Sequence, residues 1–199
     1  MTGQTLDVYL AEHVFAPLGM TETSFLPSGP QRERLVSMHA RSEGGALTTA
    51  PFGLPAPPHP GMGGGGLYST ARDYLKFLEA ILAGGAPILK PESMALMTGT
   101  EWEGPEVGVL PGVNPPLCAG FDPFPGEVKR WGLGFLINPK RGPNGRAAGS
   151  LAWAGLANCY YWADPATGVA GVFLAQLLPF GDPAALEAFG AFERAVYSA

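Results

Sequence analysis

The sequence predicts an α+β fold in which an antiparallel sheet is flanked by helices. Three observations support this prediction. Strand-like runs joined by short connections occupy the last third of the chain, an amphipathic helical pattern precedes them, and a second helical pattern follows them. Strands joined by short turns pair antiparallel, because a parallel crossover needs a dozen residues or more. The 199 residues suit one domain or a large part of one.

The first helix is predicted from Thr5, a capping residue, to about Phe15. Pro17 and Gly19 are expected to end it, because neither continues a helix easily. Residues 28–60 lack a period and include a proline-rich run. We therefore expect a long loop or a small subdomain there.

The most regular helical pattern follows a glycine-rich run. Thr70 and Asp73 have the spacing of a capping box, and Gly84 and Gly85 follow the last turn. One face of this predicted helix is apolar and carries Ala71, Tyr74, Leu75, Leu78, Ile81 and Leu82. A shorter helix is expected to begin at Pro91, since proline suits a first helical position.

Strands and a final helix are predicted from residue 131 onward. The predicted strands are Trp131–Ile137, residues 150–153 and 157–163 on either side of a kink at Gly155, and Val169–Leu178. Residues 164–168 form a turn by composition. Asp182 and Pro183 then open a helix whose apolar side carries Leu186, Phe189, Phe192 and Val196.

Gly155 interrupts an apolar, aromatic-rich run and has two interpretations. Strand glycines more often mark a bulge beside a core residue. Alternatively, a small residue at a strand edge lets a substrate lie against the strand, and the backbone N–H that follows can donate to a developing oxyanion. The sequence leaves both open.

The composition excludes several classes of protein. Apolar residues make up 46% and charged residues 15%, which argues against disorder, and no apolar run is long enough to span a bilayer. The net charge is −5 and the basic pairs are isolated, so no nucleic acid partner is expected. Neither the three histidines nor Cys118 and Cys159 have the spacing of a metal site, so no metal or other cofactor is expected. One disulfide between Cys118 and Cys159 is an open alternative, but we expect two thiols in a reducing compartment, which favours the cytoplasm unless the true N-terminus lies upstream of Met1.

Familiar catalytic motifs are absent from the sequence. Gly61, Gly63 and Gly66 match G-x-G-x-x-G, but they follow a proline-rich loop, so we expect a turn rather than a dinucleotide site. No Ser-x-x-Lys, Tyr-x-Asn, Ser-x-Asn or Gly-x-Ser-x-Gly occurs. Hydrolysis by Ser69 or Ser150 with a histidine brought close by the fold remains an open alternative.

Four stretches together resemble the serine β-lactamase-like proteins, which include the class C β-lactamases, related esterases and DD-peptidases. They occur in the family's order and cover nearly the whole chain. They are Phe-Ala-Pro-Leu-Gly-Met-Thr-Glu-Thr-Ser-Phe (15–25), the glycine run with Leu-Tyr-Ser-Thr-Ala-Arg-Asp-Tyr (63–74), Trp-Gly-Leu-Gly-Phe (131–135), and Trp-Ala-Gly (153–155) with the following Tyr-Tyr-Trp-Ala-Asp-Pro (160–165).

The resemblance implies that residues 1–199 form a single incomplete domain, the C-terminal part of a DD-peptidase fold that lacks its N-terminal portion. Trp153, Ala154 and Gly155 match the Trp-x-Gly form of the third active-site motif, which is frequent in the carboxylesterase-like branch, whereas β-lactamases usually have Lys-Thr-Gly. The resemblance implies that these three residues line the pocket and that the Leu156 N–H is one of two oxyanion-hole donors. Trp153 stands in place of a lysine that in β-lactamases helps hold a substrate carboxylate. The resemblance therefore implies that the loss of this positive charge favours neutral esters as substrates.

In this family the nucleophilic serine, its lysine partner and the tyrosine motif precede the segment seen here. The resemblance therefore implies an esterase-like serine hydrolase that forms an acyl-enzyme with a small ester or amide substrate in the complete protein, while this chain alone is inactive. The alternative is a non-catalytic binding or scaffold module. Because the family's sheet also uses N-terminal strands, we expect an exposed sheet edge through which the chain self-associates.

Overall fold

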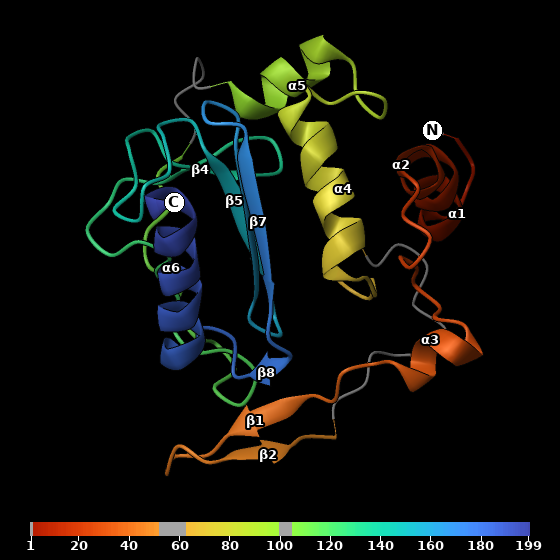
Figure 1. The fold of residues 1–199 in the computed structure, drawn as a ribbon. Coiled ribbons are helices and arrows are strands. Elements are labelled where there is room, and N and C mark those ends of the chain that lie inside the picture. Colours follow the sequence, from red (N-terminus) through yellow and green to blue (C-terminus); the bar gives the residue numbers. More distant parts are fainter. Residues whose placement is uncertain (1, 52–62, 100–104) are drawn as a thin grey trace.

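A five-stranded antiparallel sheet with helices on both faces forms the centre of the molecule, as the sequence predicts (Figure 1). The computed structural model describes residues 2–51, 63–99 and 105–199. The strands lie in the order β3 (Arg130–Trp131), β4 (Leu136–Ile137), β5 (Leu151–Gly155), β6 (Cys159–Asp164) and β7 (Val169–Leu174). The helices are α1 (Leu6–Leu10), the π-helical turn η1 (Ala11–Phe15), α2 (Ala16–Leu18), α3 (Gly29–Glu33), α4 (Ala71–Leu82), α5 (Pro91–Thr98) and α6 (Pro183–Ser198).

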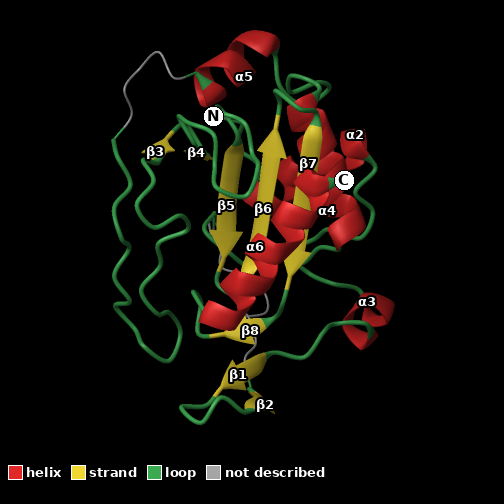
Figure 2. Ribbon diagram, turned by 60° about the vertical axis from the view of Figure 1, so that its left-hand side comes forward, coloured by secondary structure: helices red, strands yellow, loops and turns green. Residues whose placement is uncertain are grey.

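Side chains of the central strands alternate between two hydrophobic cores, because successive residues of a strand point to opposite faces. Leu151 packs toward α4 and contacts the cluster that contains Leu78. Ala152 and Trp162 pack on the other face, where Phe189 of α6 covers them. The sheet is thus enclosed between α4 and α6 (Figure 2).

A second, small sheet contains β2 (Leu47–Thr49), β1 (His39–Arg41) and β8 (Leu177–Leu178). β1 pairs antiparallel with β2 and parallel with β8. Part of the segment 28–60 is therefore structured: it holds α3 and the β1–β2 hairpin. Its proline-rich end, residues 52–60, lies outside the described residues.

The predicted helices are confirmed with one change. α4, α5 and α6 begin as predicted, after Thr70, at Pro91 and after Asp182. The first helix continues past Phe15 through η1 and α2 and ends at Leu18, so Pro17 lies within it and does not end it. Gly19 then ends it in the left-handed conformation, with φ 64°.

Two predicted strands are each divided in the structure. Trp131–Ile137 is a hairpin of β3 and β4, since Gly134 has a φ of 106° and the Gly132 N–H donates to the Phe135 carbonyl at 2.8 Å. Val169–Leu178 breaks near Gln176, which has a φ of 55°. The chain then leaves the central sheet, and β8 pairs with β1 instead.

Asp73 joins two of the stretches that the sequence analysis singled out, residues 15–25 and 63–74. Its buried carboxylate accepts hydrogen bonds from the Glu22 N–H at 2.7 Å and the Thr23 hydroxyl at 3.0 Å, and it pairs with Lys76 at 2.9 Å. Burial alone raises the pKa of Asp73, but these hydrogen bonds outweigh burial and hold the pKa below its ordinary value.

No helix in the described part of the chain combines the length and apolar composition needed to cross a membrane.

Trp162 is fully buried and lies directly on the backbone of Gly171, its neighbour on β7. A Cβ atom at Gly171 would lie 2.1 Å from the indole ring. The indole Nε1 donates to the Tyr197 hydroxyl at 3.1 Å, and that hydroxyl donates to Asp164 at 2.9 Å. The ring is therefore held on both sides and cannot shift without breaking this chain of hydrogen bonds.

We expect Gly171→Ala to lower the free energy of unfolding by about 2 kcal/mol, because the added methyl group overpacks a filled core. Gly155→Ala is the matched control: a Cβ there would lie 3.7 Å from the Cys159 Cβ, an ordinary contact, so the change should be about 0.5 kcal/mol or less. Urea denaturation of both variants measures this. Equal effects at the two glycines would contradict the packing described.

Candidate active site

The chain reverses at Leu156–Asn158, a three-residue turn between β5 and β6. Gly155 pairs regularly with Cys159 and has no positive φ, so the predicted kink at Gly155 is wrong. The reversal occurs one residue later, where Asn158 adopts the left-handed conformation with φ 53°. A left-handed third residue is typical of three-residue hairpin loops, so the irregular position is Asn158 and not Gly155.

The outer edge of β5 is covered along only part of its length. β4 pairs only with Leu151 and Ala152. Its first residue, Leu136, lies opposite Ala152, and the chain before Leu136 turns back into β3 and does not continue along β5. Among the described strands, none pairs with this edge beyond Ala152. Residues 153–155 therefore form an open strand edge.

Backbone groups at the end of β5 point toward this open edge. The Asn138 N–H donates to the Ser150 carbonyl at 3.1 Å, so the alternating residues 150, 152 and 154 direct their backbone groups away from β6. The Gly155 carbonyl faces β6, and across a planar trans peptide the Leu156 N–H points the opposite way. No acceptor in the described part of the chain takes a hydrogen bond from this N–H.

The end of β5 is accessible. Gly155 is exposed, and Leu156 keeps 42% of its surface. Gly155 does not have the left-handed conformation that favours glycine. A Cβ atom added at Gly155 would lie 3.7 Å from the Cys159 Cβ, an ordinary contact, so steric crowding does not require a glycine either. The packing of the described residues gives no reason for a glycine at this position, and the interpretation of Gly155 as a bulge residue does not hold.

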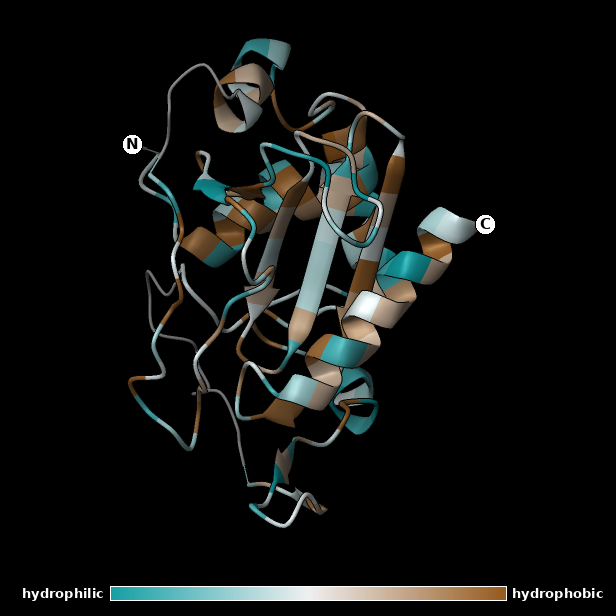
Figure 3. Cartoon of the chain, turned by 90° about the vertical axis from the view of Figure 1, so that its left-hand side faces the viewer, coloured by the Kyte–Doolittle hydropathy of each residue, from teal (hydrophilic) through white to brown (hydrophobic). Residues whose placement is uncertain are grey.

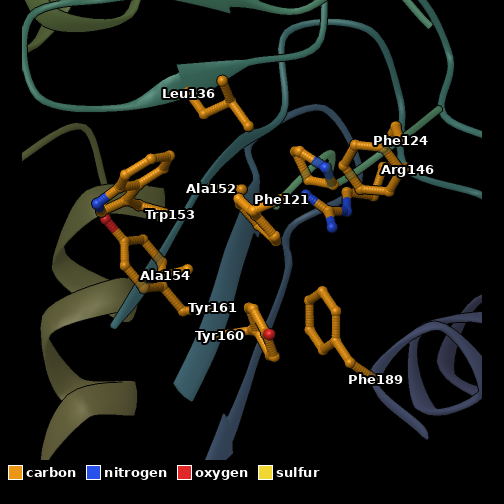
Figure 4. Close-up of a pocket in the computed structure, with 11 residues that line it drawn as sticks. Phe121, Phe124, Leu136, Arg146, Ala152, Trp153, Ala154, Tyr160, Tyr161 and Phe189 are labelled. Carbon is orange, nitrogen blue, oxygen red and sulfur yellow. The ribbon is translucent and has the colours of Figure 1, made fainter. Parts of the chain in front are cut away.

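Aromatic side chains border the open edge. Trp153 packs against Trp131 with ring centroids 4.5 Å apart, and Phe121 lies 6.5 Å from Trp153. Behind Ala154, a small cavity reaches Tyr160 and the buried Arg146, whose guanidinium group faces it (Figure 4). That cavity has room for about one water molecule, so it is too small to hold a substrate.

Three ionisable side chains near the end of β5, those of Tyr74, Cys159 and Tyr161, stay neutral near pH 7. Burial raises the pKa of Tyr161 to about 12 and that of Tyr74, whose ring is 5.2 Å from Tyr161, still further. Burial also raises the pKa of the Cys159 thiol. None of the three supplies the ionised nucleophile or general base that acyl transfer needs.

The alternative serines lack a catalytic arrangement. The Ser69 Oγ lies 2.8 Å from the Thr23 hydroxyl beside the start of α4, and Ser150 is fully buried. Neither has a hydrogen bond to a histidine within residues 2–51, 63–99 and 105–199, although His59 lies outside these ranges. The same residues contain no cluster of histidine, cysteine and acidic side chains that could hold a metal ion.

The glycine motif before α4 is described only in part, since Gly61 lies outside the described residues. Its other members form a turn, and Gly66 has a φ of 92°. This agrees with the predicted turn that leads into a helix.

Asn158 is a residue that the sequence analysis missed. Its side chain is fully buried and makes hydrogen bonds to the segment 177–182. Asparagine tolerates the left-handed conformation, so an asparagine three residues after a strand glycine was the signal that could have identified this turn. The segment it contacts ends at Asp182, which caps α6 and accepts two hydrogen bonds from Arg41.

Comparisons with known proteins agree with one another. A sequence model of the Beta-lactamase family matches residues 1–195. Monacolin J acid methylbutanoyltransferase of Aspergillus terreus is 30% identical, over 99% of this chain and 50% of that protein. Lovastatin esterase of Penicillium rubens is 29% identical, over 86% of this chain and 45% of that protein. A solved structure of a mutant simvastatin synthase from Aspergillus terreus has a TM-score of 0.81 at 26% identity, over 99% of this chain and 52% of that one.

The chain spans about half the length of the curated relatives it matches. The segment described here carries the Trp-Ala-Gly strand and its turn. Ser-x-x-Lys and Tyr-x-Asn do not occur within its 199 residues.

The Asp182 carboxylate predicts how stability depends on pH. Burial alone raises its pKa, but hydrogen bonds from Arg41 and the Ala185 N–H outweigh burial and hold the pKa below the ordinary 3.8. A depressed folded-state pKa gives stability that is present above about pH 4 and lost as the pH falls further. We therefore expect Asp182→Asn to be less stable than the wild type near pH 7, by a margin that shrinks below pH 4. Urea unfolding across this range tests it, and a margin independent of pH would contradict it.

Proposed function

The chain belongs to the β-lactamase family and has its fold, and we propose that it forms the C-terminal half of the active site of an esterase-like serine hydrolase. The observation that carries the proposal is the Leu156 N–H, which faces the open edge of β5 without an acceptor among the described residues. It follows a glycine that the surrounding packing does not require. Both features suit a strand end against which a substrate carbonyl lies.

The proposed chemistry is acyl transfer through a serine ester. The oxygen of a serine from the preceding half of the protein adds to the ester carbonyl, and its proton passes to a neighbouring base. The carbonyl oxygen becomes negative and accepts a hydrogen bond from the Leu156 N–H. The carbon–oxygen bond then breaks, and the leaving alcohol takes the proton. Water adds to the acyl-serine in the same way, which releases the acid and restores the serine hydroxyl.

The side chains beside this N–H favour a neutral, apolar acyl group. Trp153 stands where a β-lactamase usually has lysine, and it packs against Trp131 and Phe121. An aromatic border offers apolar contact area but no positive charge for a substrate carboxylate. The names of two relatives, an esterase and a methylbutanoyltransferase, suit this choice of substrate class, and an alcohol could replace water as the acceptor.

The proposal is tested with two proteins: the 199-residue chain, and a longer protein that carries the preceding coding region in frame. We expect the chain alone to hydrolyse p-nitrophenyl butyrate no faster than buffer. The longer protein should hydrolyse it, and a serine-directed phosphonate should abolish that activity. A longer protein that is folded and inert toward esters, amides and lactams would contradict the proposal and favour a non-catalytic binding or scaffold module.

In the longer protein, Leu156→Pro removes the N–H together with the leucine side chain and is compatible with the turn, because proline suits its first position. We expect kcat to fall by about 10²–10³-fold, as for the loss of one oxyanion donor. Leu156→Ala is the matched control, since it truncates the side chain and keeps the N–H. If both variants keep the kcat of the wild type, Leu156 is not the donor.

We further propose that the isolated chain self-associates through β7. No described strand pairs with the outer edge of β7, whose residues Val169–Leu174 include no charge and no proline. Figure 3 shows the strand in brown and pale tones, without the teal of hydrophilic residues. Edge strands that stay monomeric usually carry charges, proline or a bulge.

Sedimentation velocity tests this pairing on the chain alone. We expect dimers or larger species for the wild type, and a shift toward monomer for Leu174→Lys, which places a charge on the edge. Leu96→Lys, a change at an exposed leucine of α5, is the matched control and should associate like the wild type. A wild-type chain that is monomeric at every concentration would refute the pairing.

A further inference from the structure

The turn between β5 and β6 is held from one side by a single buried side chain. We propose that Asn158 is the positioning residue that keeps the Leu156 N–H directed at the open edge of β5. This inference rests on the proposed function, because it concerns the same oxyanion donor. It adds a residue that neither touches the substrate nor belongs to the Trp-Ala-Gly strand.

The backbone of Asn158 restricts which residues the turn accepts. Its φ of 53° lies in the left-handed region, which asparagine, aspartate and glycine tolerate better than other residues. The turn therefore depends on this position for its shape. A glycine would preserve that shape, which separates the role of the backbone from that of the side chain.

The side chain of Asn158 uses its whole hydrogen-bonding capacity inside the protein. Its Nδ2 donates to two carbonyls and its Oδ1 accepts from three groups. The acceptors are the carbonyls of Leu177 and Pro179, both at 2.8 Å, and the donors are the Gly181 N–H at 3.0 Å, the Asp182 N–H at 3.1 Å and the Tyr160 hydroxyl at 2.6 Å.

A backbone contact fastens the middle of the turn to the same segment. The Leu177 N–H donates to the Ala157 carbonyl at 3.1 Å. Two of the three turn residues are thus tied to residues 177–182, Ala157 through its carbonyl and Asn158 through its side chain, and the Leu156 N–H has no acceptor among the residues described. These ties hold the turn in place without using the Leu156 N–H.

Residues 177–182 are themselves rigidly held. β8 pairs with β1 in the second sheet, and Asp182 both caps α6 and pairs with Arg41 of β1. The position of the turn is therefore set by the second sheet and α6 rather than by β5 alone. Oxyanion donors act through preorganised geometry, and a displacement of about 1 Å is enough to cost 10²-fold in rate.

The test compares Asn158→Gly with Tyr197→Phe. Asn158→Gly keeps the left-handed turn and removes the side-chain ties. Tyr197→Phe is the matched control: it removes the hydrogen bonds to Trp162 and Asp164 at the other end of β6, away from the turn. In the longer protein we expect Asn158→Gly to lower kcat for p-nitrophenyl butyrate at least tenfold with KM little changed, whereas Tyr197→Phe leaves both at the wild-type value.

A second readout needs no catalysis. In the 199-residue chain, the Leu177 amide should exchange its hydrogen faster in Asn158→Gly than in the wild type, and at the wild-type rate in Tyr197→Phe. If Asn158→Gly does not fold, Asn158→Asp replaces it, because aspartate tolerates the turn and keeps the acceptor oxygen but loses both donors; the same direction of change is expected.

The outcomes separate the two proposals. An inactive wild-type longer protein overturns the proposed function and the positioning role with it. An active wild type whose kcat is unchanged by Asn158→Gly overturns the positioning role alone. Equal losses of kcat in Asn158→Gly and Tyr197→Phe would also overturn it, because they would show an effect of general destabilisation.

Discussion

The three-residue turn after Gly155 is the constraint on which the rest of the site depends. Its shape requires a left-handed Asn158, and its position is set by hydrogen bonds from that residue to the segment 177–182. Through β8 and Asp182 the same segment connects the small sheet, α6 and the central sheet. A local reversal of the chain is therefore fixed by contacts between residues far apart in the sequence, which is what a preorganised site requires.

In the proposed function the turn matters because β5 extends beyond its neighbour β4. β4 ends opposite Ala152, so the last residues of β5 keep their backbone groups available on one side. In most sheets an open edge is a liability that is covered or charged. Here the open part is short, bordered by Trp153 and Trp131, and ends at an N–H directed outward. The proposal assigns the oxyanion donor to this arrangement and the nucleophile to the preceding half of the protein, since the chain spans about half the length of a relative such as the methylbutanoyltransferase.

The sequence predicts the fold well where local signals agree. Thr70 caps α4 by accepting a hydrogen bond from the Asp73 N–H, and the apolar periodicity of that helix matches its buried face. The reciprocal half of the predicted capping box does not form, because the Asp73 carboxylate bonds to Glu22 and Thr23 instead. The errors occur where tertiary contacts decide. The division of Trp131–Ile137 depends on how the β3–β4 hairpin folds back, and Gly155 looks like a bulge residue until the pairing with Cys159 is known. The site is predictable to the level of the Trp-Ala-Gly motif. The contacts behind the role proposed for Asn158 are not, because its partners lie some twenty residues downstream.

The central claim, that the Leu156 N–H stabilises an oxyanion, is tested most directly by a crystal structure of the longer protein inhibited by a serine-directed phosphonate. The phosphonyl oxygen stands in for the carbonyl oxygen of the tetrahedral intermediate. The account predicts that this oxygen lies about 2.7–3.1 Å from the Leu156 nitrogen, at the open end of β5. A phosphonyl oxygen bound elsewhere, with the Leu156 N–H directed at solvent, would contradict it.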